Sequence, residues 1–321
     1  MEKIAVLTSG GDAPGMNAAI RAVVRRGIFK GLDVYGVQRG FKGLIDGDFV
    51  KMNHGSVGDI IQRGGTILQC AHFEDFETVE VQQQMLAQLK ENDIDGLVVI
   101  GGNDSFKCAG NLNAQGFSTI GIPSTIDNDM AGTEYTIGFD TAVNTAVKAV
   151  DNIRDTAFSH DRNYVIEVMG RHAGDIALWS GMCSGAESII IPEADHDLED
   201  VVDRIKREYE RGKTHSIVVV AEGVGKGIGR EVGKIIQEKT GFDTKVIILG
   251  HVQRGGSPSA YDRMRGSQMG AKAVDLLVKG ERGVMVGLKN GGLIHTPFEE
   301  VAKEKHLLDL NVHQLARSLS I

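Results

Sequence analysis

The chain has 321 residues, of which 41% are hydrophobic and 24% charged, and its formal net charge at pH 7 is -8. This length exceeds what one hydrophobic core usually supports, so two lobes are expected, and the composition excludes disordered and fibrous classes. The acidic balance excludes general nucleic-acid binding, because affinity for a phosphate backbone needs a basic face.

The sequence also bears on location and redox state. No apolar stretch is long enough to span a bilayer, and the start Met1-Glu2-Lys3 lacks the pattern of a secretory signal, so we expect a cytoplasmic protein without membrane contact. The three cysteines, Cys70, Cys108 and Cys183, show no C-x-x-C spacing. They are expected to be reduced thiols rather than zinc ligands.

The first half of the chain repeats one pattern, in which a short apolar run is followed by a polar turn. Strands are predicted at 3–8, 96–101 and 117–123, followed by turns at 9–12, 102–105 and 124–127, with a helix over 17–30. Such alternation indicates a mainly parallel sheet with covering helices. Because ligands of these sheets bind beyond the carboxyl ends of the strands, the three turns should converge on one cleft.

A second series of elements begins near Asp140. Helices are predicted over 141–157 and 198–211, and strands at 163–168, 188–191, 216–220 and 245–249. The two halves look like similar doubly wound α/β units with a cleft between them. We assign residues 1–138 with about 255–305 to one lobe, and 139–254 with about 306–321 to the other.

Several of the predicted turns carry groups suited to phosphate chemistry. The turn at 9–17 offers backbone N–H groups and a positive helix end to an anion, although it equally suits a simple helix cap. Asp127 and Asp129 follow a strand together with Thr125, and one carboxylate of such a pair can act as a base. An Asp-rich turn is the plainer interpretation of these residues.

Arginines and a histidine stand in similar glycine-rich settings. Arg171 follows the strand at 163–168, where a guanidinium can stabilise charge on a transferring phosphoryl group, and Arg162 precedes it. His251 and Arg254 are suited to a sugar phosphate. Each of these residues alone is more often a surface ion-pair or capping residue. Basic helix residues, concentrated at Arg21, Arg25, Arg26, Arg154, Arg211 and Lys213, indicate either a solvated face or an anionic effector site.

Taken together, five motifs resemble those of the bacterial 6-phosphofructokinases, in order and along the full chain. They are Leu7–Asp12, Thr125–Asp129, Met169–Asp175, Val220–Gly223 and Gly250–Pro258. The resemblance implies a cytoplasmic, allosterically regulated glycolytic kinase that transfers a phosphoryl group from ATP, with Mg²⁺, to the 1-hydroxyl of fructose 6-phosphate. It also implies a homotetramer whose subunits share sites, with a donor-binding first lobe and a sugar-binding second lobe.

The resemblance also assigns roles on the sugar and effector sides. Asp127 would be the base, with Thr125 and Asp129 close by, and Arg171 would steady the transferring group. Sugar-phosphate contacts are implied for Met169, Gly170, Glu222, His251 and Arg254, and, from an adjacent subunit, for Arg162 and Lys245. Lys245 stands where the family usually has arginine. An effector pocket for ADP or phosphoenolpyruvate is implied at Arg21, Arg25, Asp59, Arg154, Gly185, Glu187, Arg211 and Lys213.

The donor side departs from the ATP-using pattern. The donor residues implied by position are Gly11, Phe41, His72, Phe73, Gly102, Asn103, Asp104 and Ser105. The magnesium-binding acid of the family is replaced by Asn103, so the metal would bind there or, displaced by one residue, at Asp104. His72, Phe41 and Cys108 replace an arginine, a tyrosine and a glycine.

These departures leave two alternatives to an ATP-dependent kinase. Asp104 resembles the acid of pyrophosphate-using relatives, which pair it with a lysine at the place of Ser124. A pyrophosphate-dependent phosphofructokinase is therefore the second interpretation. A catalytically weak regulatory paralogue that binds sugar phosphate or nucleotide is the third, because the changes gather on one side of the expected cleft.

Overall fold

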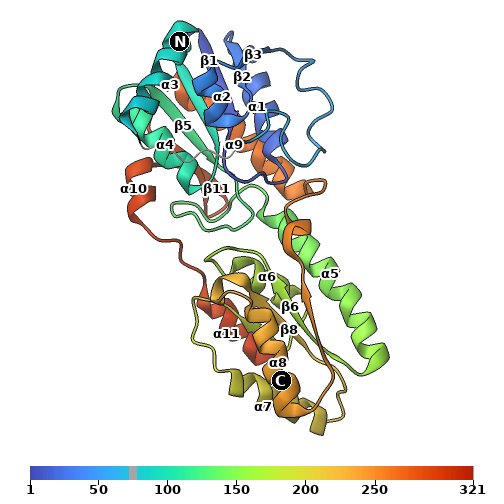
Figure 1. The fold of residues 1–321 in the computed structure, drawn as a ribbon. Helices are drawn as coiled ribbons and strands as arrows, with labels where there is room; N and C mark the ends of the chain where they lie inside the picture. The colour runs from blue at the N-terminus through green and yellow to red at the C-terminus, as the bar shows by residue number, and fades with distance from the viewer. Residues whose placement is uncertain (72–77, 321) are drawn as a thin grey trace. The chain divides into compact units, whose positions relative to one another are not determined.

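The computed structural model describes residues 1–71 and 78–320, which form two compact α/β units (Figure 1). Unit 1 comprises Met1–Thr125, Met130–Thr141 and Arg254–His306. Unit 2 comprises Ile126–Asp129, Ala142–Gln253 and the described residues from Leu307 onward. Each unit contains a mainly parallel sheet with flanking helices, which confirms the predicted fold class. Among the described residues, no helix is long and apolar enough to cross a bilayer.

Within the described residues, the sheet of unit 1 has seven strands in the order β11-β10-β5-β4-β1-β2-β3. The strands are β1 (Lys3–Thr8), β2 (Asp33–Val37), β3 (Phe49–Met52), β4 (Gly96–Gly101), β5 (Ser118–Pro123), β10 (Val284–Lys289) and β11 (Gly292–Pro297). The central strands are parallel, and the edge strands β3 and β11 are antiparallel to their neighbours. The central strands β1 and β4 are almost entirely buried, as expected of a sheet covered on both faces.

The helices of unit 1 bury the two faces of this sheet. They are α1 (Met16–Phe29), α2 (Gly40–Asp46), α3 (Val79–Glu91), α4 (Asn103–Ala114), α9 (Ala260–Val278) and α10 (Phe298–Lys303). Helices α1 and α9 pack against each other, and a Cβ at Gly270 of α9 would lie 2.6 Å from the carbonyl oxygen of Ala19 (Figure 1). The missing side chain therefore permits the close approach of the two helices.

Unit 2 has a fully parallel sheet of four described strands in the order β7-β8-β6-β9. They are β6 (Asn163–Val168), β7 (Ser188–Ile190), β8 (Ile217–Ala221) and β9 (Thr244–Ile248). The helices are α5 (Phe139–His160), whose first turn belongs to unit 1, α6 (Asp175–Cys183), α7 (Leu198–Glu210), α8 (Ile228–Thr240) and α11 (Leu310–Leu319). Short 3₁₀ turns follow β8 at Glu222–Val224 and β9 at Gly250–Gln253.

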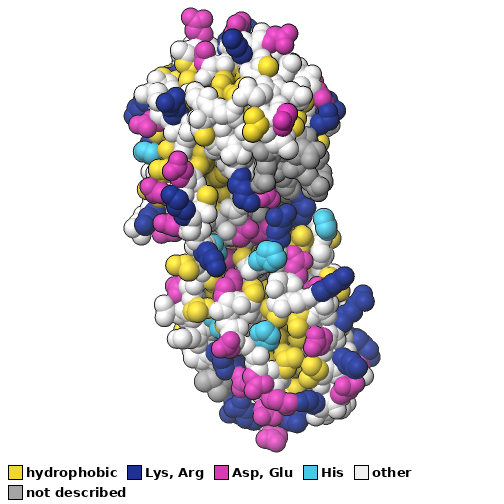
Figure 2. Space-filling model, turned by 60° about the vertical axis from the view of Figure 1, so that its left-hand side comes forward, with side chains coloured by type: hydrophobic (Ala, Val, Ile, Leu, Met, Phe, Trp, Pro, Cys, Tyr) yellow, Lys and Arg dark blue, Asp and Glu magenta, His cyan; other side chains and the backbone are white. Residues whose placement is uncertain are grey.

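The core of unit 2 lies between this sheet and helices α7 and α8. Val165, Val218, Val202 and Ile205 are at most 1% exposed. Each such side chain contributes about 1.5–3 kcal/mol by leaving water. On the surface, the face shown in Figure 2 carries Lys and Arg interspersed with Asp and Glu rather than one extended basic area.

A buried aspartate of α9 fixes the start of α5 within unit 1. The carboxylate of Asp262 accepts hydrogen bonds from the Tyr135 hydroxyl, the Gly138 N–H, and both the N–H and the hydroxyl of Thr141. Burial raises the pKa of Asp262, while these hydrogen bonds lower it. Burial and the carboxylate together raise the pKa of Tyr135, so its hydroxyl stays protonated and donates. The turn at 135–141 is thereby tied to α9.

We predict that Asp262→Asn lowers the free energy of unfolding by about 2–4 kcal/mol. Each carboxylate oxygen now accepts two hydrogen bonds, and the NH2 group of asparagine, which cannot accept, would replace one of these oxygens and leave its donors unsatisfied. Asp275→Asn is the matched control on the same helix, since Asp275 forms a partly exposed ion pair with Arg26. That change should cost only about 0–1 kcal/mol. Urea denaturation of both variants measures the difference, and equal losses would contradict the role of Asp262.

Candidate active site

The loops that follow β6, β8 and β9 carry the residues predicted to bind a sugar phosphate. Met169, Gly170 and Arg171 follow β6, Glu222 follows β8, and His251 lies in the turn after β9. Because these strands are neighbours and parallel, the loops share one edge of the sheet. Hydrogen bonds join them: the Arg171 N–H donates to Glu222 Oε1 (3.0 Å), and the Met169 N–H donates to the Gln253 side chain (3.4 Å).

The segment Ile126–Asp129 belongs to the same unit and brings the predicted base to this edge. Asp127 Oδ2 lies 3.7 Å from Arg171 Nε, and the Asp127 side chain is 9% exposed whereas that of Arg171 is 66% exposed. The next residue, Asn128, donates from its side chain to Asp175 Oδ1 (3.0 Å), at the start of α6. A nearly buried carboxylate is therefore held beside an exposed guanidinium.

Backbone conformation helps to shape the loop that carries Arg171. Gly170 has φ 141° and Arg171 has φ 52°, the left-handed region that costs energy for a side-chain-bearing residue. Across from it, a Cβ at Gly223 would lie 2.2 Å from the Arg171 carbonyl oxygen. The absence of a side chain at Gly223 therefore allows the two loops to approach.

Arg162 and Lys245 lie at the opposite end of the sheet of unit 2. Arg162 directly precedes β6 and Lys245 lies near the start of β9, and both pair with Asp243, at 2.6 and 3.0 Å. A six-residue strand spans about 20 Å, so these two cations are far from the loop of Arg171 in their own chain.

Arg254 and Thr125 belong to unit 1. Arg254 donates to Asp12 Oδ1 (2.9 Å), and a Cβ at Gly11 would lie 2.4 Å from the Arg254 guanidinium, so Gly11 makes room for it. The Thr136 hydroxyl donates to the Thr125 carbonyl (2.7 Å) and so anchors the segment that follows β5. The pairing of Arg254 with Asp12 was not anticipated from the sequence.

The predicted donor residues gather mostly at the carboxyl edge of the sheet of unit 1. The turns after β1, β4 and β5 are adjacent, since the Ser9 N–H donates to Ile100 (3.0 Å) and the Ser124 N–H to Gly101 (2.9 Å). Gly102 is the N-cap of α4, followed by Asn103, Asp104 and the buried Ser105. The positive end of α4 therefore faces this edge, as an anion site requires.

Other donor-side residues have different surroundings. Asp104 Oδ1 lies 3.2 Å from Lys107 Nζ, and both side chains are exposed. Phe41 and Cys108 are buried in the core of unit 1, where burial raises the pKa of Cys108 to about 12. His72 and Phe73 lie outside the described residues. Within the part of the chain described, no group of three or more His, Cys, Asp or Glu side chains is arranged to hold a metal ion.

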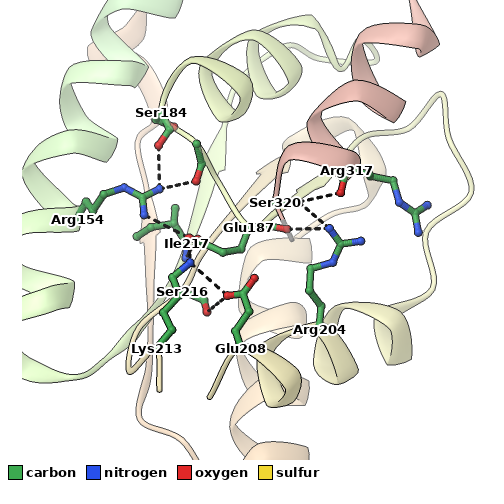
Figure 3. Close-up of polar contacts among 11 residues, drawn as sticks. Arg154, Ser184, Glu187, Arg204, Glu208, Lys213, Ser216, Ile217, Arg317 and Ser320 are labelled. Carbon is green, nitrogen blue, oxygen red and sulfur yellow. Dashed lines mark hydrogen bonds and ion pairs between the residues drawn. The ribbon is translucent and has the colours of Figure 1, made fainter. Parts of the chain in front are cut away.

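The predicted effector residues fall in both units. In unit 2, Glu187 is only 4% exposed, and its carboxylate accepts from Arg154 (3.3 Å), Lys213 and the Ile217 N–H (2.5 Å) (Figure 3). Arg154 also donates to the carbonyls of Ser184 and Gly185, both at 2.8 Å. We call Arg154, Gly185, Glu187 and Lys213 the effector cluster. In unit 1, Arg21 and Arg25 lie on α1, and Asp59 lies in an exposed turn.

Two residues around the effector cluster were missed by the sequence analysis. Glu208 Oε2 lies 3.3 Å from Lys213 Nζ and accepts from the Ser216 hydroxyl (3.2 Å). Burial lowers the pKa of His215, although the charge of Glu187 acts in the opposite direction. Neither residue has a local sequence signal, because each acts through partners supplied by the fold.

Comparison with known proteins identifies the family. The Phosphofructokinase family profile matches residues 3–277. The chain belongs to the phosphofructokinase family. ATP-dependent 6-phosphofructokinases of Halalkalibacterium halodurans and Shouchella clausii are 59% and 58% identical over 321 residues, which is 100% of this chain and of each relative.

Solved structures of phosphofructokinases share the fold. The phosphofructokinase of Saccharomyces cerevisiae gives a TM-score of 0.88 at 35% identity over 99% of this chain and 47% of that chain. The pyrophosphate-dependent phosphofructokinase of Marinobacter aquaeolei gives 0.85 at 20% identity over 97% and 86% of the two chains. The second likeness shows the common fold and does not discriminate between phosphoryl donors.

We predict that Gly223→Ala lowers phosphofructokinase kcat/KM by roughly 10- to 100-fold, because the new Cβ would displace the Arg171 loop. Gly225→Ala is the matched control, since its Cβ would meet nothing within 4 Å and its φ of 174° is extended. The control should retain the parent kcat/KM. Steady-state kinetics of both variants decides, and similar effects would argue against the close approach of the loops.

Proposed function

We propose that this protein is an ATP-dependent 6-phosphofructokinase, which forms fructose 1,6-bisphosphate from fructose 6-phosphate in glycolysis. The observation that carries the proposal is the placement of Asp127 beside Arg171, at the edge formed by the loops after β6 and β8. The names of relatives 58–59% identical over the whole chain support the same reaction and donor.

In this proposal Asp127 acts as the general base. It accepts the proton of the 1-hydroxyl as that oxygen attacks the terminal phosphorus of ATP, whose bond to the bridging oxygen breaks so that ADP leaves. The Arg171 guanidinium stabilises the charge that develops on the phosphoryl oxygens, and the hydrogen bond from the Arg171 backbone N–H to Glu222 holds its loop. Thr125 and Asp129 flank Asp127 in sequence and complete the catalytic group.

The sugar phosphate is bound by the surrounding loops. We assign this binding to Met169, Gly170, Glu222, His251 and Arg254. Arg162 and Lys245 lie at the far end of the sheet from the Arg171 loop, so they are suited to the 6-phosphate bound by a neighbouring subunit. A homotetramer with shared sites accounts for this placement. Lys245 lacks the bidentate fork of arginine, which weakens sugar affinity somewhat.

The donor phosphates would lie at the amino end of α4, near Gly11, Gly102 and Ser105. Mg²⁺ takes oxygen ligands, which the donor's own phosphates and the side-chain oxygen of Asn103, at the first turn of α4, would supply. Bound there, Mg²⁺ would neutralise charge on the transferring phosphates. We further propose a cytoplasmic enzyme regulated by ADP and phosphoenolpyruvate through the effector cluster together with Arg21, Arg25, Asp59 and Arg211.

Pyrophosphate is the second candidate donor, favoured by the carboxylate of Asp104. An acid at this position repels the additional phosphate of ATP, whereas pyrophosphate has no group there. The ion pair with Lys107 offsets part of that repulsion and so favours ATP. Phe41 and Cys108, which stand where ATP-using relatives have a tyrosine and a glycine, are buried in the core of unit 1. Their side chains therefore do not bear on the choice between ATP and pyrophosphate.

A donor screen tests the proposal directly. Purified protein with fructose 6-phosphate, Mg²⁺ and either ATP or pyrophosphate should form fructose 1,6-bisphosphate with ATP, as followed by a coupled aldolase assay. If only pyrophosphate supports turnover, the protein is a pyrophosphate-dependent phosphofructokinase instead. If neither donor supports turnover, the interpretation as a regulatory paralogue replaces both.

We predict that Asp127→Ser lowers kcat by about 10²–10⁴-fold while the KM for fructose 6-phosphate changes little, because proton transfer is lost but the sugar-binding loops remain. Steady-state kinetics with saturating ATP gives both constants. A kcat within a few-fold of the parent would exclude Asp127 as the base.

We predict opposite effects on ATP affinity from the two members of the Asp104–Lys107 pair. Asp104→Ala should lower the KM for ATP if its charge repels the donor, and Lys107→Gln should raise it roughly threefold or more by exposing that charge. In the Asp104→Ala background, Lys107→Gln should have a smaller effect. A higher KM in Asp104→Ala would instead indicate that Asp104 binds the metal.

A further inference from the structure

A positively charged cavity of about 500 Å³ lies in unit 2, outside the residues assigned above to the active site. Its walls are formed by α7 with its C-cap residue Arg211 and by α11 with its C-cap residue Ser320. The lining residues are Arg204, Arg207, Glu208, Arg211, Gln314, Arg317, Ser318 and Ser320. This volume falls within the usual range for a small-molecule site of about 300–1,000 Å³.

All eight lining residues are of polar or charged type, and four of them are arginines. The four arginines share the lining with one acidic residue, Glu208, whose carboxylate is engaged with Lys213 and Ser216. Asp200, behind the lining, pairs with Arg317 (2.7 Å) and more distantly with Arg204 (3.7 Å). Four guanidinium groups against two carboxylates leave the cavity net positive in a chain of net charge -8. An anion is the complementary ligand.

The cavity wall is partly preorganised. Arg204 is 14% exposed and donates from Nη1 to the Glu187 carbonyl (3.2 Å) and to the Ser320 hydroxyl (2.8 Å) (Figure 3). Arg317 reaches the same region from α11 and is held by Asp200. Arginines whose positions are fixed in advance lose little conformational entropy when a ligand binds.

The spacing of the arginines defines the size of the ligand. Arg204, Arg207 and Arg211 stand at positions i, i+3 and i+7, which places them along one face of α7 and its cap. Seven residues of helix rise about 10 Å, so the row exceeds the width of a single phosphate. Among the described residues that line the cavity, none has an aromatic side chain on which a nucleobase could stack. These features favour a compact anion with at least two phosphate groups and no base.

We propose that this cavity is a binding site for compact polyphosphate anions, either inorganic or carried on a small organic scaffold. It is distinct from the effector cluster, none of whose four residues lines it. Two of its lining residues lie close in role or position, namely Arg211, which is expected to bind an effector, and Glu208, which pairs with Lys213. The proposal does not depend on which phosphoryl donor the enzyme uses.

Calorimetric titration of the full-length protein with inorganic triphosphate and, separately, with 2,3-bisphosphoglycerate tests the proposal. At least one probe should bind the parent protein. Its affinity should fall by roughly tenfold in Arg207→Gln and by more in Arg207→Gln/Arg317→Gln, because each change removes a charge-assisted contact. The probe that binds distinguishes an inorganic from an organic ligand. Arg207 is exposed and donates to the Asp203 carbonyl within its own helix, so Arg207→Gln should fold even if the double variant does not.

Two further variants make the result specific. Arg230→Gln removes the same charge from an exposed position on α8 outside the cavity and should bind like the parent protein. Lys213→Gln alters the effector cluster and should retain most of the binding. The proposal is overturned if neither probe binds the parent protein, if Arg207→Gln binds as tightly as Arg230→Gln, or if only Lys213→Gln abolishes binding.

Discussion

The loops after β6 and β8 are organised around one contact, in which the nearly buried carboxylate of Asp127 lies 3.7 Å from the guanidinium of Arg171. It forms because the four residues Ile126–Asp129 belong to unit 2, although the segments before and after them belong to unit 1. The hydrogen bond between Asn128 and Asp175 fixes the same segment beside the amino end of α6. A carboxylate and a guanidinium are thus placed together before any substrate binds, as the proposed mechanism requires of its base and its stabilising cation.

Much of the fold could be predicted because apolar runs bounded by glycine turns mark buried parallel strands. The strands predicted at 3–8, 96–101 and 163–168 have these same bounds in the structure. In unit 1 the edge strands β3 and β11 were missed together with their neighbours β2 and β10. Strand β11 shows one reason, since its residues are intermediate or exposed and carry no continuous apolar signal. An edge strand depends on pairing with a neighbour more than on its own composition.

The candidate site was less predictable than the fold, because its contacts join residues far apart in the sequence. The order of the strands explains why the loops of Arg171, Glu222 and His251 share one edge. The sequence contains no local sign that Asp262 caps the turn at 135–141, more than 120 residues away. It likewise could not show the close approach at Gly223, which depends on the backbone of another loop.

The most direct test of Asp127 as the base is a crystal structure of the protein with fructose 6-phosphate and a non-hydrolysable ATP analogue. The 1-hydroxyl oxygen should lie about 2.6–3.2 Å from an Asp127 carboxylate oxygen, with the Arg171 guanidinium directed at the terminal phosphoryl group. A sugar whose 1-hydroxyl points away from Asp127, with Arg171 still paired to that carboxylate and remote from the donor, would contradict the proposed mechanism.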